Sequence, residues 1–327
     1  MKLVEIQPNK YNDLSLSEPG ISFCQTSNWG SFYSRLGFDC VYLGYVDDAN
    51  VYSALGLFII KKAESFFAKK TATCPFGYLI NYYDTKLLKD FTNDVRKYLS
   101  KHGVGQLTIN PNLTYITPRG NNDLLIKNME SLGYKKTSNK SIYQTKIKEI
   151  EKPKATEDIY LKTYTVEDRD NKLFKNNANY RYLYQTMGNM AKFVVCEIDT
   201  KKSIDALNES INEAKQFIEI HQDDYKYNEI MNNKKQAIES KEYLLSLINN
   251  LQDECVLAVS CLIEFNNKIT QLFVDDKKDY AVINSTEMLQ YQVLEMINKL
   301  GYESFESYIP FSNSSKTELI GEFTYRI

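Results

Sequence analysis

The sequence is poor in the residues on which many catalytic sites depend. It contains only two histidines, His102 and His221, in 327 residues. A histidine-based zinc site or catalytic triad is therefore not expected, because each needs an imidazole among further ligands or beside a nucleophile. We expect no metal. The six cysteines include no Cys-x-x-Cys pair, which indicates free thiols in a reducing cytoplasm.

Glycine-rich phosphate loops and membrane-spanning runs are missing as well. The nearest approach to a phosphate loop, Gly103-Val-Gly105, lacks a third glycine and a following helix. We therefore expect no cofactor, and the same absence disfavours an acetyl-CoA-dependent reaction. No apolar run reaches the ~18 residues of a membrane helix, and no signal segment is recognisable. The protein is predicted to be cytoplasmic.

Neither sign of charge dominates, and the length indicates more than one domain. Forty basic and 42 acidic residues give a net charge of −2, which provides no global attraction to nucleic acid. At ~150 residues per domain, the chain is expected to form about two domains. A charged segment containing proline at 148–157 separates residues 1–150 from 151–327. Strand and helix patterns alternate in both halves, which predicts an α/β (α+β) fold.

A short phrase occurs in both halves. Ser131-Leu-Gly-Tyr134 and Lys299-Leu-Gly-Tyr302 each follow a helical pattern and precede a strand pattern. The repetition predicts two similar α/β halves and is consistent with an internal duplication.

A helical hairpin is predicted at 203–252, between strand patterns at 192–198 and 254–263. The first helix repeats apolar or aromatic residues every seven positions, which is typical of an antiparallel coiled-coil arm. The segment contains no glycine or proline, and nine acidic residues outnumber five lysines. This acidic surface disfavours tRNA binding and favours packing or a protein partner. The repeats are Ile204, Ile211, Ile218 and Tyr225, then Ile230, Ala237, Leu244 and Leu251, and Tyr225, Tyr227 and Ile230 are the candidate contacts at the tip.

Four stretches together resemble one protein family. They are Phe23-Cys-Gln-Thr-Ser-Asn-Trp-Gly30, Leu107-Thr-Ile-Asn-Pro-Asn-Leu-Thr-Tyr115, Asp168-Arg-Asp-Asn-Lys-Leu-Phe174 and the arm itself. With these four stretches in this order, the chain resembles the Fem-type peptidoglycan aminoacyltransferases, in particular the members that carry an arm. The resemblance covers most of the chain, although no single motif is diagnostic.

The resemblance implies a fold and an activity. It implies two GNAT-like (acyl-CoA N-acyltransferase-like) subdomains, with the arm inserted in the second. The implied reaction transfers an amino acid from aminoacyl-tRNA, as co-substrate, to an amine of a lipid-linked or nucleotide-linked muropeptide precursor, without a covalent intermediate. A homodimer, a heterodimer with a related protein and peripheral membrane contact are compatible with this interpretation.

The resemblance also suggests site residues. Tyr115 and Arg169 match positions near the precursor groove, and an arginine fork suits a diphosphate. Trp29, Asn110 and Arg35 belong to or lie near matching motifs, with Asn110 where the family usually has Asp. For Tyr115 simple packing is the alternative, and for Arg169 a surface ion pair.

The sequence departs from the family in its charged parts. The segment 148–160 is too short to hold the family's basic stretch, and a lysine phrase near the C-terminus is replaced by residues 308–316. Only Lys316 there can supply an ammonium group, so Lys316 is the candidate catalytic residue. Two further interpretations stay open, namely a non-catalytic paralogue that acts as partner or regulator, and a transferase redirected to an acceptor outside the cell wall.

Overall fold

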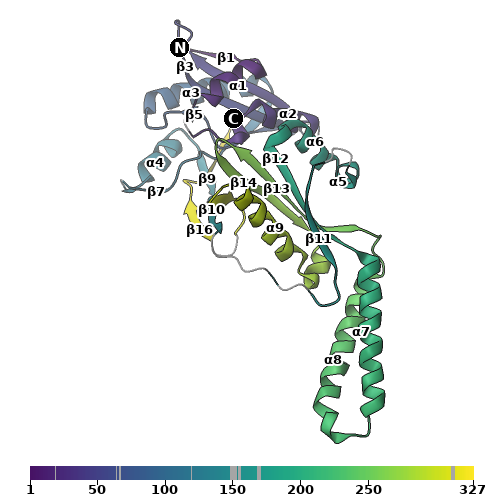
Figure 1. Cartoon of the computed structure of the whole chain (residues 1–327). Coiled ribbons are helices and arrows are strands. Elements are labelled where there is room, and N and C mark those ends of the chain that lie inside the picture. The colour runs from purple at the N-terminus through teal and green to yellow at the C-terminus, as the bar shows by residue number, and fades with distance from the viewer. Residues whose placement is uncertain are drawn as a thin grey trace.

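The computed structural model shows two twisted sheets that lie beside each other, with a long helical arm projecting from the second (Figure 1). The predicted α/β class is confirmed. The structure describes residues 1–327 except 19, 64, 66, 67, 119, 148–152, 154, 155, 168–170 and 311–313.

The first sheet contains most strands of the first half and the last strand described. Helices α3 and α4 cover one face, and α1 and α2 lie on the other. The helices are α1 (Pro8–Leu16), α2 (Ser27–Arg35), α3 (Thr85–Lys101) and α4 (Asp123–Ser131). The strand order is β1 (Lys2–Glu5), β2 (Asp39–Val46), β3 (Tyr52–Lys61), β4 (Lys70–Cys74), β6 (Val104–Ile109), β17 (Glu322–Arg326) and β9 (Lys135–Ser138), with β5 (Leu79–Ile80) beside β3 and a separate pair β7 (Ile116–Thr117) and β8 (Gly120–Asn121).

The second sheet is built in the same way. Helix α9 (Ser285–Lys299) covers one face, and α5 (Lys172–Asn176) and α6 (Ala178–Met187) lie on the other. The strand order is β11 (Leu161–Val166), β12 (Ala191–Ile198), β13 (Cys255–Phe265), β14 (Lys268–Asp276), β15 (Ser304–Ser307), β10 (Ser141–Lys146) and β16 (Ser314–Glu318).

The two sheets correspond strand by strand. Each has one parallel pair at the same place in its order, β4 with β6 and β14 with β15, and a helix connects the two strands of each pair. Helix α9 is therefore the counterpart of α3, which ends before Gly103. The repeated phrase predicted two similar halves, but its two copies are not equivalent, because the copy at Gly133 ends α4 and leads into the edge strand β9.

The two halves exchange one strand each. Strand β10 pairs with β15 and β16 in the second sheet, whereas β17 pairs with β6 and β9 in the first. The division expected from the sequence, 1–150 and 151–327, therefore differs from the sheets by these two strands. The reason is physical: an alternating strand pattern shows which face of a strand is buried but not which strands it pairs with.

The largest hydrophobic cluster joins the two halves. Helix α2 packs against α6, and Trp29 and Phe32 of the first half share a cluster with Phe174 and Phe193 of the second. Separate clusters fill the outer faces, beneath α3 and α4 in one half and beneath α9 in the other. The shared cluster and the exchanged strands make the two sheets one packed unit.

The predicted arm consists of α7 (Thr200–His221) and α8 (Asn228–Ile248), joined through a 3-10 turn at Tyr225–Tyr227. Leu207 and Ile248 at its base pack with Ile198 and Leu257 of the sheet. Toward the tip the second buried row differs from the prediction. Met231 and Ile238 are buried, one position after the expected Ile230 and Ala237.

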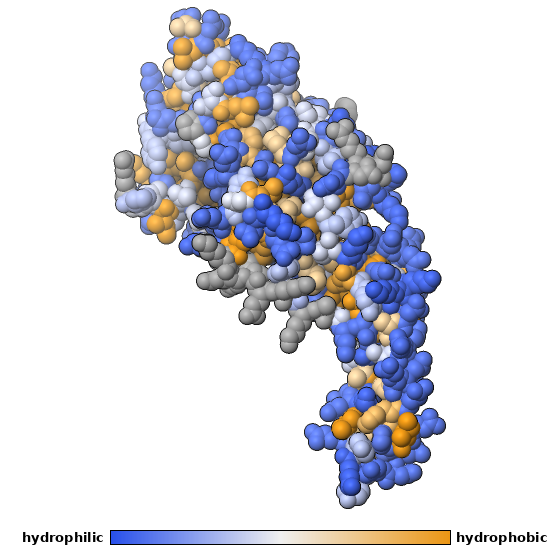
Figure 2. Space-filling model, in the orientation of Figure 1, coloured by the Kyte–Doolittle hydropathy of each residue, from blue (hydrophilic) through white to orange (hydrophobic). Residues whose placement is uncertain are grey.

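Outside the buried rows between α7 and α8, the surface of the arm is mainly hydrophilic, with exposed apolar side chains near the tip (Figure 2). Ile220, Tyr225 and Ile230 are among these exposed side chains. At the base, Lys241 bonds Asp158 at 2.7 Å, which ties α8 to the segment before β11. Among the residues described, no helix has the length and apolar character required to cross a bilayer.

Candidate functional site

Two groups of cavities are candidates for a functional site. Two small cavities of about 240 and 130 Å³ lie where the halves meet, and both are lined by Gly20, Ser22, Phe76 and Asn112. We call them the interface cavities. A larger cavity of about 830 Å³ lies in the second half beside the base of the arm, and we call it the arm-base cavity.

The interface cavities begin where β4 and β6 separate. The two strands pair in parallel as far as Cys74 and Ile109, and then the chains diverge. Asn110 accepts a hydrogen bond from the Phe76 backbone N–H at 2.9 Å, which holds Phe76 in a left-handed conformation with φ of 58°. The Phe76 ring contacts Tyr308 of the second half, with centroids 5.6 Å apart. Asn110 therefore shapes these cavities through Phe76.

A buried glutamine fixes the opposite wall. The Gln25 side-chain oxygen accepts hydrogen bonds from the Tyr11 hydroxyl at 2.7 Å and the Leu57 backbone N–H at 3.0 Å. Its amide nitrogen donates to the Pro75 carbonyl. Gln25 also lines the smaller interface cavity. The sequence placed Gln25 inside a family motif but did not single it out, because its partners come from three distant segments.

The structure brings Tyr115 and Lys316 close to each other. The Tyr115 backbone N–H donates to the Glu318 carbonyl at 2.7 Å, and the Lys316 ammonium bonds the Glu318 carboxylate at 3.0 Å. The Tyr115 hydroxyl donates to Asp123 at 2.8 Å, and this bond raises the pKa of Tyr115. Glu318 raises the pKa of Lys316, so this exposed lysine is a cation and not a base. The strand neighbour of Lys316, Thr317, pairs with Ile142, which lines an interface cavity.

The other predicted site residues lie elsewhere. Trp29 is 6% exposed and packs edge-on against Phe23, so its indole lies in the shared core rather than in any of the three cavities. Arg35 donates to Gln185 at 2.7 Å and thereby links α2 to α6. Arg169 lies outside the described residues. The structure thus links Asn110 to the interface cavities through Phe76, brings Tyr115 and Lys316 together at Glu318, and places Trp29 and Arg35 in the packing between the halves.

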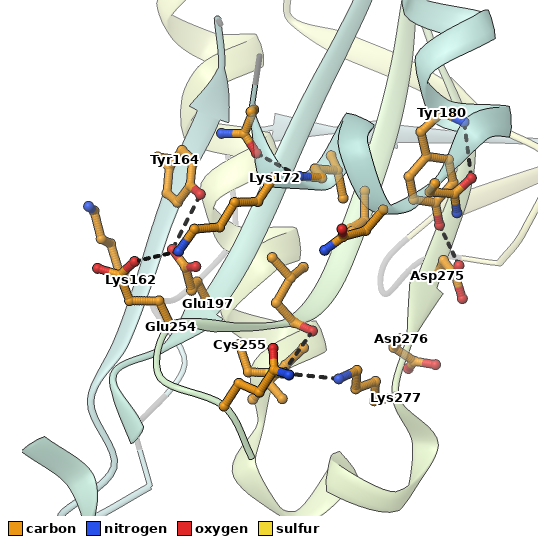
Figure 3. Close-up of a pocket in the computed structure, with 18 of the residues that line it drawn as sticks. Lys162, Tyr164, Lys172, Tyr180, Glu197, Glu254, Cys255, Asp275, Asp276 and Lys277 are labelled. Atoms are coloured by element: carbon orange, nitrogen blue, oxygen red, sulfur yellow. Dashed lines mark hydrogen bonds and ion pairs between the residues drawn. The ribbon is translucent and has the colours of Figure 1, made fainter. Parts of the chain in front are cut away.

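The arm-base cavity lies on the α5 and α6 face of the second sheet, at the end next to the arm (Figure 3). Tyr164 and Glu197 lie on one side of it, and Tyr180 and Asp275 on the other. Its lining mixes both signs of charge with an apolar floor. The lining residues are Lys162, Tyr164, Asn171, Lys172, Leu173, Asn176, Asn177, Tyr180, Glu197, Gln252, Asp253, Glu254, Cys255, Val256, Leu257, Val259, Asp275, Asp276 and Lys277.

Hydrogen bonds and an ion pair hold the charged lining in place. The Tyr164 hydroxyl donates to Glu197 at 3.3 Å, and the Tyr180 hydroxyl donates to Asp275. Lys172 pairs with Glu254 at 3.2 Å. Burial raises the pKa of the Glu197 carboxyl above its ordinary value and outweighs the bond from Tyr164. Among the described residues there is no group of three or more His, Cys, Asp or Glu side chains arranged to hold a metal.

Glu197 faces this cavity through the alternation of β12, because Phe193 and Val195 lie on the same face of that strand, and an irregularity in β13 lies beside it. The pairing of β12 with β13 shifts between Cys196 and Glu197, which leaves Leu257 as an extra residue. Bulges of this kind re-aim side chains and are frequent beside functional sites. Sequence reasoning missed the cavity because its walls come from five separate segments, and the whole arm separates β12 from β13 in the sequence. The local signals were the run Gln252-Asp-Glu254 at the end of the arm and the family stretch Asp168–Phe174, of which Asn171, Lys172 and Leu173 line the cavity.

Comparisons with known proteins agree with this architecture. Residues 6–165 match the model of the FemAB family, and a search of curated proteins returned no match. The fold is similar to a solved structure described as the crystal structure of FemX, with a TM-score of 0.60 and 14% identity, covering 100% of this chain and 98% of that chain. It is also similar to a tandem GNAT protein from the clavulanic acid biosynthesis pathway, with a TM-score of 0.62 and 8% identity, covering 99% and 98%.

At these identities the structural similarity establishes the fold, namely two GNAT-like halves in one chain. The assignment to a family rests on the sequence match of the first half. Residues 6–165 therefore match the Fem-type (FemAB) family by sequence, and the whole chain has a fold similar to that of FemX.

Proposed function

We propose that the protein is an aminoacyltransferase that moves an amino acid from aminoacyl-tRNA to an amine of a peptidoglycan precursor. The match of residues 6–165 to the FemAB family is the observation that carries this proposal. The tandem GNAT-like fold supports it, because GNAT-like folds are built for acyl transfer to amines. Fold alone does not fix the substrate.

The proposed reaction needs no covalent enzyme intermediate. The acceptor nitrogen attacks the ester carbonyl of aminoacyl-tRNA, and the carbonyl oxygen becomes an oxyanion. When this intermediate collapses, the new C–N bond remains and the C–O bond to the ribose breaks. The proton lost by the nitrogen passes, directly or through water, to the departing ribose oxygen, which leaves as a hydroxyl. The enzyme contributes by holding the two substrates in position and by stabilising the oxyanion. No cofactor is proposed.

The interface cavities are the proposed place of this step, because residues of both halves line the larger of the two. Lys316 and Tyr115 are not among the lining residues, and any part they take in the step is a proposal from the family resemblance. The two side chains differ in what they can offer. Lys316 is a permanent cation that can stabilise developing negative charge once a substrate loosens its pair with Glu318. Tyr115 can exchange its bond to Asp123 for one to the acceptor. Arg169 stays a proposed phosphate contact.

The test is transfer of a labelled amino acid from charged tRNA to nucleotide-linked and lipid-linked muropeptides by the purified protein. We expect label in one of them, and a loss of about 10–100-fold for Lys316→Met, at or below the loss measured for oxyanion-hole donors. Lys97→Met is the matched control, since Lys97 forms a similar exposed ion pair, with Asp94, on α3.

Absence of transfer with every common aminoacyl-tRNA would overturn the proposal. Transfer that appears only when a related active protein is added would favour the alternative of a regulatory paralogue. Transfer to a non-muropeptide amine would favour a redirected transferase.

A further inference from the structure

We infer that the arm-base cavity is a second binding site, which takes an ammonium group carried on an aliphatic chain, as in a lysine-type side chain or an aminoacyl ester. The cavity is separate from the interface cavities. Thr270 lines an interface cavity and Asp275 lines the arm-base cavity, and these residues lie five positions apart on β14. At ~3.4 Å per residue, Thr270 and Asp275 are ~17 Å apart along the strand.

The charge of the lining selects the sign of the ligand. Five carboxylates face three lysines around the cavity, which leaves an excess of two negative charges. One lysine, Lys172, is paired with Glu254 at 3.2 Å. Another, Lys277, lies 3.0 Å from the Cys255 sulfur. A phosphate entering this cavity would meet net repulsion, whereas an ammonium group would meet attraction.

Glu197 is the residue best placed to bind the ammonium group. It pairs across the strands with Lys162 and lies on the same face of β12 as Phe193 and Val195, which is the face that the cavity occupies. Tyr164 donates one hydrogen bond to its carboxylate at 3.3 Å. A carboxylate has about four acceptor positions, so the bond from Tyr164 leaves capacity for an ammonium donor. The carboxylate is also half-buried, and a charge-assisted bond is stronger there than in open solvent.

The remaining lining fits the carbon chain that carries the ammonium group. Leu173 and Val259 are buried and form part of the apolar floor of the cavity. A cavity of about 830 Å³ lies within the range of ~300–1,000 Å³ that is typical of small-ligand sites.

The experiment is isothermal titration calorimetry on the intact protein with four probes at pH 6.5, where both amines are protonated. N-acetyl-lysine methylamide carries a side-chain ammonium group, and alanine methyl ester imitates an aminoacyl ester. The Nε-acetylated form of the first probe is neutral, and inorganic phosphate is an anion. We expect one or both amines to bind, and the neutral probe and phosphate to bind at least tenfold more weakly. The stronger amine identifies which source of the ammonium group the cavity prefers.

Variants locate the binding. We expect Glu197→Gln to weaken the amine about tenfold, which corresponds to about 1.4 kcal/mol. Glu254→Gln, which alters an exposed side chain and leaves folding intact, should also weaken it. Glu303→Gln, an exposed carboxylate of the same half outside the cavity, should have no effect. Binding should fall as the pH is lowered through the raised pKa of Glu197.

Three results would overturn the inference: no binding of either amine, equal binding of the acetylated probe, or tighter binding of phosphate. The measurement uses no tRNA and no transfer reaction. A failure here therefore leaves the proposed function standing, and a failure of the transfer assay leaves this site standing.

Discussion

The position of strand β17 in the first sheet leads to a prediction about stability that links the two ends of the chain. Phe323 is fully buried, and it lies in the cluster beneath α3 and α4 of the first half. Its backbone pairs with Ile109 on one side and Lys136 on the other. We expect Phe323→Ala, although Phe323 belongs to the second half of the sequence, to destabilise the first sheet.

The magnitude follows from burial. A buried aromatic side chain removes about 150–250 Å² from water, which at ~25 cal/mol per Å² corresponds to roughly 4–6 kcal/mol. Measured Phe-to-Ala costs in cores are about 3–5 kcal/mol. We therefore expect a loss of about 4 kcal/mol in the free energy of unfolding. This is a large part of the ~5–15 kcal/mol that stabilises a typical domain.

Urea unfolding followed by the fluorescence of Trp29, the only tryptophan, reports on the cluster where the first half packs against the second. The midpoint should fall strongly at an unchanged slope. Hydrogen exchange should accelerate in β6 and β9. Arg326→Ala, an exposed position of the same strand, is the control and should change stability by less than ~0.5 kcal/mol. A loss of protection confined to the second sheet, with the Trp29 transition unchanged, would refute the exchange of strands.

Two further predictions concern single polar groups. Gln25→Met should lower the free energy of unfolding by about 3 kcal/mol or more. The reason is that the Tyr11 hydroxyl, the Leu57 N–H and the Pro75 carbonyl each lose a buried partner, at a cost of ~1–3 kcal/mol apiece. A free energy of unfolding within ~1 kcal/mol of wild type, measured by urea unfolding, would contradict this. Burial raises the Glu197 pKa above 4.5, so the native state binds this proton more tightly than the unfolded chain, and stability falls as pH rises through that window. The Glu197→Gln side chain cannot ionise, so this variant should be more stable than wild type at pH 8 but not at pH 4, as measured by urea midpoints. A variant more stable than wild type at pH 4 and less stable at pH 8 would be inconsistent with a buried carboxylate.

Elements with strong local signals were predictable from the sequence. Helix α3 has a regular apolar stripe that includes Leu88, Val95 and Leu99, and the Asp84 side chain caps its first turn at 2.9 Å. The arm helices follow from their seven-residue repeats in the same way. The buried row of α8 was placed one residue early because a 3-10 turn precedes this helix, and the sequence pattern does not show the phase that such a turn imposes.

Features that depend on distant partners were not predictable. Nothing in the alternation of residues 141–147 indicates that β10 joins the second sheet, since the pattern fits an edge of either. The family resemblance suggested Asn110, which contacts a residue lining the interface cavities, and Tyr115 and Lys316, which the structure brings together at Glu318. It did not suggest Glu197, because the other walls of the arm-base cavity come from segments distant in the sequence.

The strand exchange also sets an order in time. Thr108 on β6 and Thr324 on β17 contact each other at 3.2 Å although they are 216 residues apart. At ~5–20 residues per second, a ribosome needs roughly 10–40 s to make the chain between them. During this interval the first sheet has an open gap between β6 and β9, where unpaired backbone groups could accept a foreign strand. The nascent chain therefore has a period of exposure that ends only when residues 322–326 emerge from the ribosome.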